Sequence, residues 1–307
     1  MRIVITGPTG AVGIALIKEC IQHNIEVLAI CHRRSRRIER IPVSANVKIL
    51  ELDLEEYADY MPTEEYQGYD VFYHFAWNGT IGNERNDMVL QHKNIGYALD
   101  AVSLAAKMGC NTFIGAGSQA EYGRVEGLLS AKVPTFPENG YGIAKLCAGQ
   151  MTRILCGQIG IRHIWTRILS VYGPYDGELT MITSSIRKLL KGEIPAFTKG
   201  EQQWDYLYSA DAASAMRLLG EQGKDGKIYC IGSGTTRKLA DYIRIMRDTV
   251  NPDQEIALGA VPYNAKQVMY LCADITELQQ DTGFEPKVDF ETGIRETVRW
   301  VRENGRY

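Results

Sequence analysis

The chain has 307 residues, of which 45% are hydrophobic, and it carries a formal net charge of −3 with an isoelectric point near 6.0. A chain of this kind can bury a full core in about two domains, and its acidic balance argues against a nucleic-acid partner. No apolar run approaches the roughly 18 residues that span a bilayer, and no charged stretch leads into an apolar N-terminal segment. We therefore expect a cytoplasmic protein with no membrane contact. The seven cysteines include no CxxC pair, which indicates reduced thiols and no metal site.

Strand and helix patterns alternate along the first half of the chain. Residues 2–6 form a short apolar strand, 13–24 have the apolar spacing of a helix, and 26–32 form a second strand. The alternation continues with one further helix, 94–109, and with strands at 47–53, 70–76, 111–117 and 161–169. This order predicts an α/β fold, a Rossmann-type doubly wound parallel sheet covered by helices.

The pattern changes after about residue 172, where Gly and Pro interrupt short segments. We expect a smaller C-terminal substrate-binding lobe there. The predicted division assigns 1–171 and 211–232 to the Rossmann domain, and 172–210 and 233–307 to the lobe.

Three glycines, Gly7, Gly10 and Gly13, follow the first strand and open the first helix in the sequence VITGPTGAVGIAL. Glycine destabilises a helix, but in this context it lets the backbone approach a pyrophosphate at the positive helix N-terminus. Gly7 would form the turn, Gly10 would admit the phosphates, and Gly13 would allow close packing of helix and strand. A tight βα turn that binds no ligand is the alternative interpretation.

Tyr141 and Lys145 lie four residues apart in the sequence YGIAK, so one helix would present both on the same face. Tyrosine keeps its proton up to pH about 10, but a nearby ammonium and a nicotinamide ring favour the phenolate and permit proton exchange with a carbinol. An ordinary amphipathic helix would explain this pair by itself. However, the pair is accompanied by Ser118 at the end of a predicted strand, by AEYG after it, and by Asn94 at the start of a predicted helix.

The chain resembles the extended short-chain dehydrogenases/reductases, the NAD(P)-dependent epimerases, dehydratases and reductases of nucleotide-activated sugars. The resemblance covers essentially all of the chain. Besides the motifs above it rests on LDLEE (52–56), YHFA (73–76), TRILSVYGP (166–174), WDYLYSADAA (204–213), YCIGSG (229–234) and DITELQQDTGFEPKVDFETGI (274–294).

The resemblance implies a role for each matching residue. Ser118 would hydrogen-bond the reacting oxygen, Tyr141 would be the catalytic acid/base, and Lys145 would hold the nicotinamide ribose and tune Tyr141. It also implies a homodimer, because the helix that carries the tyrosine and its neighbour pair between subunits in many members. The expected cofactor-binding residues are Gly7, Thr9, Gly10, Ala11, Val12, Gly13, His32, Arg33, Arg34, Asp53, Leu54, Phe75, Ala76, Trp77, Asn94, Tyr141 and Lys145.

The end of the second strand bears on cofactor choice. NAD-preferring relatives usually have an acid there that binds the ribose hydroxyls, whereas this chain has Cys31. His32, Arg33 and Arg34 follow and could bind the 2′-phosphate of NADP. NADP is therefore favoured; NAD, with the arginines in a solvated loop, is the alternative.

The residues after Ser118 bear on the reaction. The 4,6-dehydratases that the chain resembles have an Asp-Glu pair there, whereas this chain has Gln119 and Ala120. We expect hydride transfer with Tyr141 as acid/base, reducing a 4-keto(-6-deoxy) nucleotide sugar. The alternatives are a nucleotide-sugar 4-epimerase and, from another class, a catalytically silent NADP-sensing regulatory protein, which the intact Tyr and Lys disfavour.

The sequence defines the substrate less closely than it defines the cofactor or the reaction. Trp204 and Asn264 occupy positions where many relatives have an Arg that grips the diphosphate, so a substrate without a nucleotide stays open. Arg187, Lys188 and Lys199 could replace those cations. The candidate substrate-binding residues are Trp77, Asn78, Arg85, Ser118, Gln119, Ser170, Arg187 and Trp204.

Overall fold

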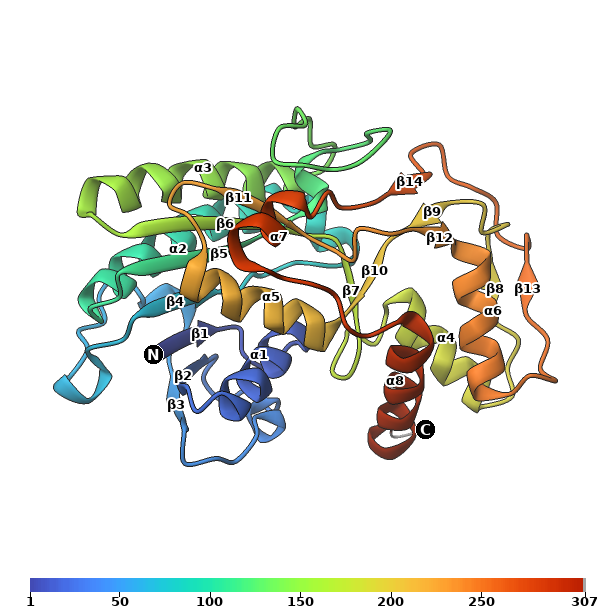
Figure 1. Ribbon diagram of the computed structural model, residues 1–307, viewed down its shortest axis with the longest axis horizontal. Helices are drawn as coiled ribbons and strands as arrows, with labels where there is room; N and C mark the ends of the chain where they lie inside the picture. The colour runs from blue at the N-terminus through green and yellow to red at the C-terminus, as the bar shows by residue number, and fades with distance from the viewer. Residues whose placement is uncertain (306–307) are drawn as a thin grey trace.

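The computed structural model describes residues 1–305 and contains a parallel sheet of seven strands in the order β11-β6-β5-β4-β1-β2-β3 (Figure 1). The strands are β1 (Arg2–Thr6), β2 (Glu26–Cys31), β3 (Val47–Glu51), β4 (Val71–His74), β5 (Thr112–Ser118), β6 (Arg162–Ile168) and β11 (Ile228–Ile231). The predicted doubly wound parallel sheet is confirmed. The strand order reverses between β1 and β4, so a crevice opens at their carboxyl ends.

Helices cover both faces of this sheet. Helices α1 (Ala11–Gln22) and α5 (Ser209–Gln222) pack together on one face, and α2 (Met88–Lys107) and α3 (Gly140–Ile159) pack together on the other (Figure 1). Along β1, Ile3 and Ile5 belong to the core beneath α1 and α5, while Val4 belongs to the core beneath α2. Because alternate side chains enter opposite cores, the central strands β1 and β4 are buried along nearly their whole length.

Two helices begin earlier than the sequence pattern predicted. Helix α1 starts at Ala11 with Gly10 as its N-cap. Helix α2 starts at Met88, because the side chain of Asp87 accepts hydrogen bonds from the first-turn amides. Asn94 therefore lies within α2, and the prediction that it starts a helix is wrong.

The C-terminal part of the chain builds a second core outside the sheet. Apolar side chains of α4, α6 and α8 meet there, among them Ile186, Ile243 and Ile294. Helix α7 instead packs on α5 and β11, and its Leu278 belongs to the sheet core. The predicted division into two domains stays a prediction. The elements are β7 (Ser170–Tyr172), α4 (Met181–Leu190), β8 (Ala196–Phe197), β9 (Gln203–Trp204), β10 (Tyr206–Tyr208), β12 (Arg237–Lys238), α6 (Leu239–Val250), β13 (Ala257–Leu258), β14 (Tyr270–Leu271), α7 (Thr276–Thr282) and α8 (Phe290–Asn304).

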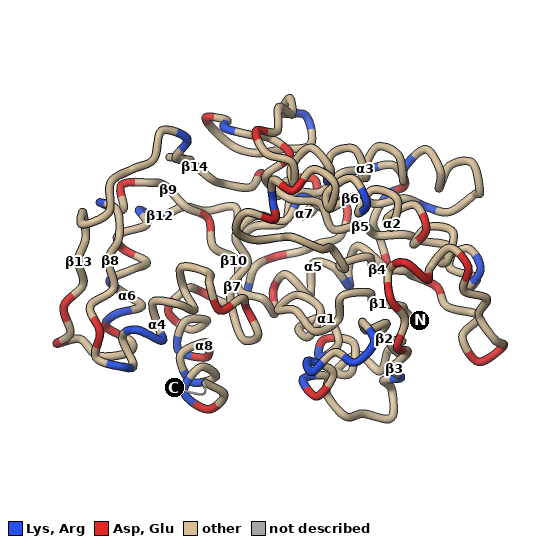
Figure 2. Tube along the Cα trace, turned by 180° about the vertical axis from the view of Figure 1, so that it is seen from behind, with Lys and Arg blue, Asp and Glu red and all other residues tan. Residues whose placement is uncertain are grey.

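Short 3₁₀ helices occupy several of the loops that connect the strands and helices. The loop between β2 and β3 holds the basic run that the sequence singled out (Figure 2). Within residues 1–305, no helix has both the length and the apolar character to cross a membrane. The 3₁₀ helices are η1 (Ile38–Arg40), η2 (Leu54–Glu56), η3 (Glu64–Tyr66), η4 (Gly82–Asn86) and η5 (Gln119–Glu121).

Candidate active site and cofactor cleft

The glycine turn between β1 and α1 is closely packed on one side and open on the other. Gly7 has φ +65°, and a Cβ there would lie 2.7 Å from the amide nitrogen of Ala76. A Cβ at Gly13 would lie 2.7 Å from the Pro8 carbonyl, so Gly13 lets α1 pack closely on the turn that follows β1. At Gly10 a Cβ would meet nothing within 4 Å, and no side chain caps α1. The positive end of α1 is therefore accessible to an anion.

A cleft of about 160 Å³ lies beside this turn. It runs between the carboxyl ends of β1, β2 and β4, at the crevice that the strand order predicts. Sequence reasoning missed Ser35 and Tyr57 in its wall; each lies a few residues beyond a motif that we had identified. The predicted residues that line it are Gly7, Thr9, His32, Leu54, Ala76, Trp77 and Asn78, and the others are Pro8, Ile30, Cys31, Ser35, Leu52 and Tyr57.

Carboxylates hold the basic loop that follows β2. The Arg33 amide donates to Asp53 at 2.7 Å, and its guanidinium donates twice to Glu56, at 2.8 and 2.9 Å. The Arg34 amide donates to Glu51 at 3.0 Å, with Arg34 at φ +56°. Arg33 therefore already has an anionic partner, whereas no ion pair among residues 1–305 engages the Arg34 guanidinium.

Helix α3 and strand β5 bring the predicted catalytic residues together. The side chain of Asn139 caps α3, so Tyr141 lies in its first turn and Lys145 one turn further on. The side chain of Ser118, the last residue of β5, lies beside the Tyr141 hydroxyl and acts to lower its pKa. The Lys145 ammonium donates to the carbonyl oxygen of Ala116 in the same strand at 2.6 Å. The three side chains converge as the resemblance implied.

Burial dominates the acid–base properties of this group. It raises the pKa of Tyr141; hydrogen bonding to Ser118 and the charge of Arg85 oppose that rise, and the carboxylate of Glu121 adds to it. Burial also lowers the pKa of Lys145 from 10.5 to about 7. Burial thus disfavours the charged form of Lys145 in the free protein.

The segment after β4 covers both residues. The ring of Trp77 lies 3.7 Å from the Lys145 Nζ and meets the Tyr141 ring edge to face, with 6.2 Å between ring centroids. The Arg85 guanidinium lies over the Tyr141 ring, 4.3 Å from its centroid. Trp77 and Arg85, both predicted to bind substrate, are thus in direct contact with the candidate catalytic residues.

Two amides of α2 hold this segment in place. The Gln91 side chain accepts from the Trp77 indole at 2.9 Å and donates to the Gly79 carbonyl at 2.8 Å. The Asn94 side chain accepts from the Asn78 amide at 3.0 Å and donates to its carbonyl at 2.9 Å. Sequence reasoning missed Gln91. Its position three residues before Asn94, on the same helix face, was the available signal.

A buried ion pair lies next to Ser118 and accepts a hydrogen bond from its backbone. Glu121 and Arg167 have side chains that are 0% and 3% exposed, and Arg167 Nε donates to Glu121 Oε2 at 2.8 Å. The other carboxylate oxygen accepts from the Ser118 amide at 2.9 Å and from the Trp165 indole at 3.0 Å. Sequence reasoning missed this network, although the charge of AEYG beside an apolar strand was a signal.

The remaining candidate substrate residues belong to β7, β9 and α4 or lie next to Ser118. The Trp204 indole donates to the Ser170 hydroxyl at 2.8 Å, so these two are together. Arg187 on α4 donates to Glu178 at 3.1 Å, so its guanidinium already has an anionic partner. Gln119 begins η5 directly after Ser118.

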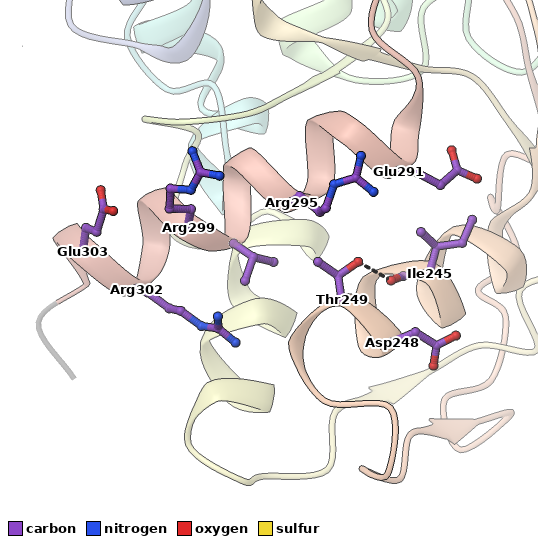
Figure 3. A pocket seen from close by; sticks show the side chains of 9 residues that line it. Ile245, Asp248, Thr249, Glu291, Arg295, Arg299, Arg302 and Glu303 are labelled. Atoms are coloured by element: carbon purple, nitrogen blue, oxygen red, sulfur yellow. Dashed lines mark hydrogen bonds between the residues drawn. The ribbon is translucent and has the colours of Figure 1, made fainter.

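A more voluminous groove, about 770 Å³, lies between α6 and α8, far along the chain from these residues (Figure 3). Arg295, Arg299 and Arg302 project from α8 there, opposite Asp248 of α6. It contains none of the candidate site residues that the sequence predicted. Volume alone therefore does not make this groove the candidate site, whereas titratable groups with perturbed pKa values converge at Tyr141.

Comparison with known proteins agrees with this architecture. The dTDP-glucose 4,6-dehydratase of Salmonella typhimurium is 29% identical over 182 residues, 56% of this chain and 49% of that protein, so the match spans about half of the relative's length. A putative UDP-glucose 4-epimerase of Methanocaldococcus jannaschii is 25% identical over 314 residues, 99% of both chains.

A solved structure shows the same fold over the whole chain. The dTDP-glucose 4,6-dehydratase from Streptomyces venezuelae, with NAD and TYD bound, superposes with a TM-score of 0.86 at 21% identity, covering 99% of this chain and 98% of that one. Residues 3–232 also match the family described as the NAD dependent epimerase/dehydratase family. Because this match covers most of the chain and includes the glycine turn, Ser118, Tyr141 and Lys145, the chain belongs to the NAD dependent epimerase/dehydratase family, as the sequence resemblance predicted.

Proposed function

We propose that this chain is an NAD(P)-dependent oxidoreductase of the short-chain dehydrogenase/reductase type that reduces a 4-keto(-6-deoxy) nucleotide sugar, with Tyr141 as the acid/base. The observation that carries the proposal is the convergence of the buried Tyr141 with Ser118 and with Lys145, which lies one helical turn away. A phenol and a hydroxyl that converge in this way can both reach one substrate oxygen, and the phenol can exchange a proton with it.

The residues around the glycine turn fit a dinucleotide. The uncapped N-terminus of α1 and the open space at Gly10 suit a pyrophosphate, and the positive φ of Gly7 lets the turn pack against Ala76 beside the cleft. Lys145 lies close enough to Trp77 of that cleft for its ammonium to bind a ribose hydroxyl there. When bound, the nicotinamide supplies the hydride for reduction, or accepts one for oxidation.

The chain's own residues perform the proton chemistry. During reduction, Tyr141 passes its phenolic proton to the substrate oxygen, while the Ser118 hydroxyl donates a hydrogen bond to the same oxygen. Trp77, held by Gln91, covers Lys145 and limits the access of water to it. Lys145, when protonated, stabilises the phenolate that remains on Tyr141.

The arrangement after Ser118 argues against dehydration as the main reaction. Gln119 and Ala120 carry no acid or base, and Ala120 is buried. The next carboxylate, Glu121, is fully buried and accepts hydrogen bonds from three donors. It therefore has no free oxygen with which to protonate a leaving hydroxyl.

A 4-epimerase is the second candidate. The Methanocaldococcus jannaschii relative, a putative UDP-glucose 4-epimerase, is similar over 99% of this chain. The same proton exchange at Tyr141 serves oxidation and re-reduction of one carbon. The two reactions differ in outcome: the reductase consumes reduced cofactor, and the epimerase interconverts two sugars with no net change in cofactor.

The test combines both assays. The purified protein is incubated with NADPH or NADH and a dTDP- or UDP-linked 4-keto-6-deoxyhexose, and separately with UDP-glucose. Tyr141→Phe should retain cofactor binding and lose about 10²- to 10⁴-fold in turnover. Ser118→Ala should keep a residual rate, and Lys145→Met should weaken both binding and turnover. Cofactor binding without turnover on any substrate would instead support an NADP-sensing regulator.

We also propose that the cofactor is NADP. The support is Cys31 at the end of β2 and the guanidinium of Arg34, which is charged and has no ion pair within residues 1–305. Binding of a 2′-phosphate by Arg33 requires it to share or leave Glu56. Calorimetry should show tighter binding of NADPH than NADH, by about 1.5–3 kcal/mol. Arg34→Gln should reduce that difference, and Arg37→Gln, in the same loop, should not.

A homodimer is the assembly that we propose. Three apolar side chains of α3, Ile143, Met151 and Ile154, are 52%, 44% and 53% exposed, and their spacing places them on one side of the helix. A symmetric contact through α3 would cover them. The same helix carries Tyr141, so assembly would also stabilise the site.

A further inference from the structure

Arg85 contacts the face of Tyr141 from a different element than Lys145 does. Its guanidinium lies 4.3 Å from the ring centroid, while the Lys145 Nζ lies 5.8 Å from it. Arg85 comes from η4, in the segment between β4 and α2, and thus belongs to no part of the YGIAK motif.

The position of Arg85 is fixed by two further hydrogen bonds. Its own Nη1 donates to the Thr80 carbonyl at 3.0 Å. The buried Gln91 of α2 donates to the carbonyl oxygen of Glu84, the preceding residue, at 3.0 Å. The backbone beside Arg85 is therefore tied to a helix, and contacts within the protein hold the guanidinium over the ring.

Lys145 supplies less charge to Tyr141 than its motif suggests. Its ammonium is directed at the Ala116 carbonyl, which it contacts at 2.6 Å, and at the Trp77 ring. Burial lowers the pKa of Lys145 to about 7, so it loses its charge as the pH rises through that value. Arginine stays protonated at any pH at which a protein is folded.

We propose that Arg85 is a positioning residue for the reaction proposed above: its guanidinium, seated on the face of the Tyr141 ring, stabilises the phenolate whether or not Lys145 is charged. The inference rests on the proposed role of Tyr141 as acid/base. A phenolate ring is richer in π electrons than a phenol, so a cation on its face is attracted more strongly to the ionised form.

The other groups that face Tyr141 do not replace this effect. The side chain of Ser118 favours ionisation of the hydroxyl, but it is neutral. Glu121 is anionic and opposes ionisation, and burial opposes it further. Arg85 is thus the permanent positive charge in direct contact with the ring.

The test measures the ionisation of Tyr141 in the free protein. A fluorinated tyrosine, which is more acidic, is introduced at position 141, and fluorine NMR follows its titration in the range where the protein is folded. At a fixed pH, Arg85→Gln should lower the phenolate fraction roughly three- to tenfold, whereas Arg85→Lys should retain much of it. Arg244→Gln removes a cation that pairs with Asp241 on α6, and should change nothing.

The sign of the shift separates this role from a structural one. If Arg85 only kept the segment closed, its loss would hydrate Tyr141, and because burial raises the pKa of Tyr141, the phenolate fraction would increase. An increased or unchanged fraction in Arg85→Gln therefore overturns the proposal.

A second measurement links the charge to turnover. In the oxidative direction, the pH profile of kcat for Arg85→Gln should move to higher pH, and Arg85→Lys should restore most of the original profile. A profile that stays in place while the phenolate fraction falls overturns the proposed acid/base role of Tyr141, and so the proposed function. The fluorine titration needs no substrate, so it tests Arg85 independently of that outcome.

Discussion

Glu121→Gln tests the buried network beneath Ser118 most directly. The substitution keeps the shape of the side chain but removes its charge, and leaves the Arg167 guanidinium buried without a counter-ion. The single oxygen of the new amide can still accept from the Ser118 amide and the Trp165 indole, but its NH₂ would then face the Arg167 Nε, a donor facing a donor. The native contacts at these three positions measure 2.9, 3.0 and 2.8 Å.

The size of the effect follows from burial. Both members of the pair are within a few per cent of complete burial, at 0% and 3% exposure. Removing one partner of such a pair costs about 3–5 kcal/mol, since the remaining charge is neither hydrated nor paired. This is a large part of the roughly 5–15 kcal/mol that separates folded from unfolded states in typical domains. We expect Glu121→Gln to lower the free energy of unfolding by about 3–5 kcal/mol.

Urea denaturation followed by circular dichroism would measure the loss, with a double-mutant cycle to isolate the pair. Replacing Glu121 and Arg167 together by leucine should recover much of the stability, because no uncompensated charge then remains. Glu138→Gln breaks an exposed pair with Arg124 and should leave the unfolding midpoint nearly unchanged. A loss below about 1 kcal/mol in Glu121→Gln would refute the argument from desolvation.

Three further predictions concern the turn, the pH dependence and the assembly. Gly7→Ala should destabilise the protein by at least about 1–2 kcal/mol and weaken cofactor binding, because residue 7 has φ +65° and the new Cβ would lie 2.7 Å from the Ala76 nitrogen. Urea denaturation measures the loss of stability, and calorimetry measures the loss of cofactor affinity. Burial lowers the pKa of His163 from 6.5 to about 4, so below pH 6.5 the unfolded chain binds a proton that the folded chain does not. Stability should therefore fall as the pH falls, by up to about 3 kcal/mol, and His163→Gln should reduce this dependence. Ile154→Arg should convert a dimer into a monomer in light scattering coupled to gel filtration, and an unchanged mass would contradict assembly through α3.

Local patterns in the sequence were sufficient for most of the sheet and for the core of the site. Six of its seven strands, β1 to β6, were recognisable within their own few residues, but β11 was not predicted as a strand. The glycine turn and the Tyr141–Lys145 pair are also local, because a turn or one helical turn places their atoms regardless of the rest of the chain. The helix starts were less accurate: Asp87 caps α2 ahead of the predicted start, and Asn94 therefore lies inside the helix.

Other features of the site depend on residues that are distant in the sequence. The pairing of Arg33 with Glu56 joins loops after two different strands, and it could not be inferred from the basic run alone. Likewise, Gln91 binds the Trp77 indole because α2 packs beside the carboxyl end of β4. Side-chain partners of this kind follow from how elements pack, and no spacing along the chain reports them.

The sequence by itself thus determined the parallel α/β architecture, the glycine turn and the identity of Ser118, Tyr141 and Lys145 as the candidate centre. Only the tertiary structure decided which charges surround that centre. It placed Arg85 on the Tyr141 ring and buried Glu121 against Arg167, a contact between residues 46 positions apart. The physical reason is that backbone conformation responds mainly to neighbouring residues, whereas desolvation and charge depend on every group that the fold brings within a few ångströms.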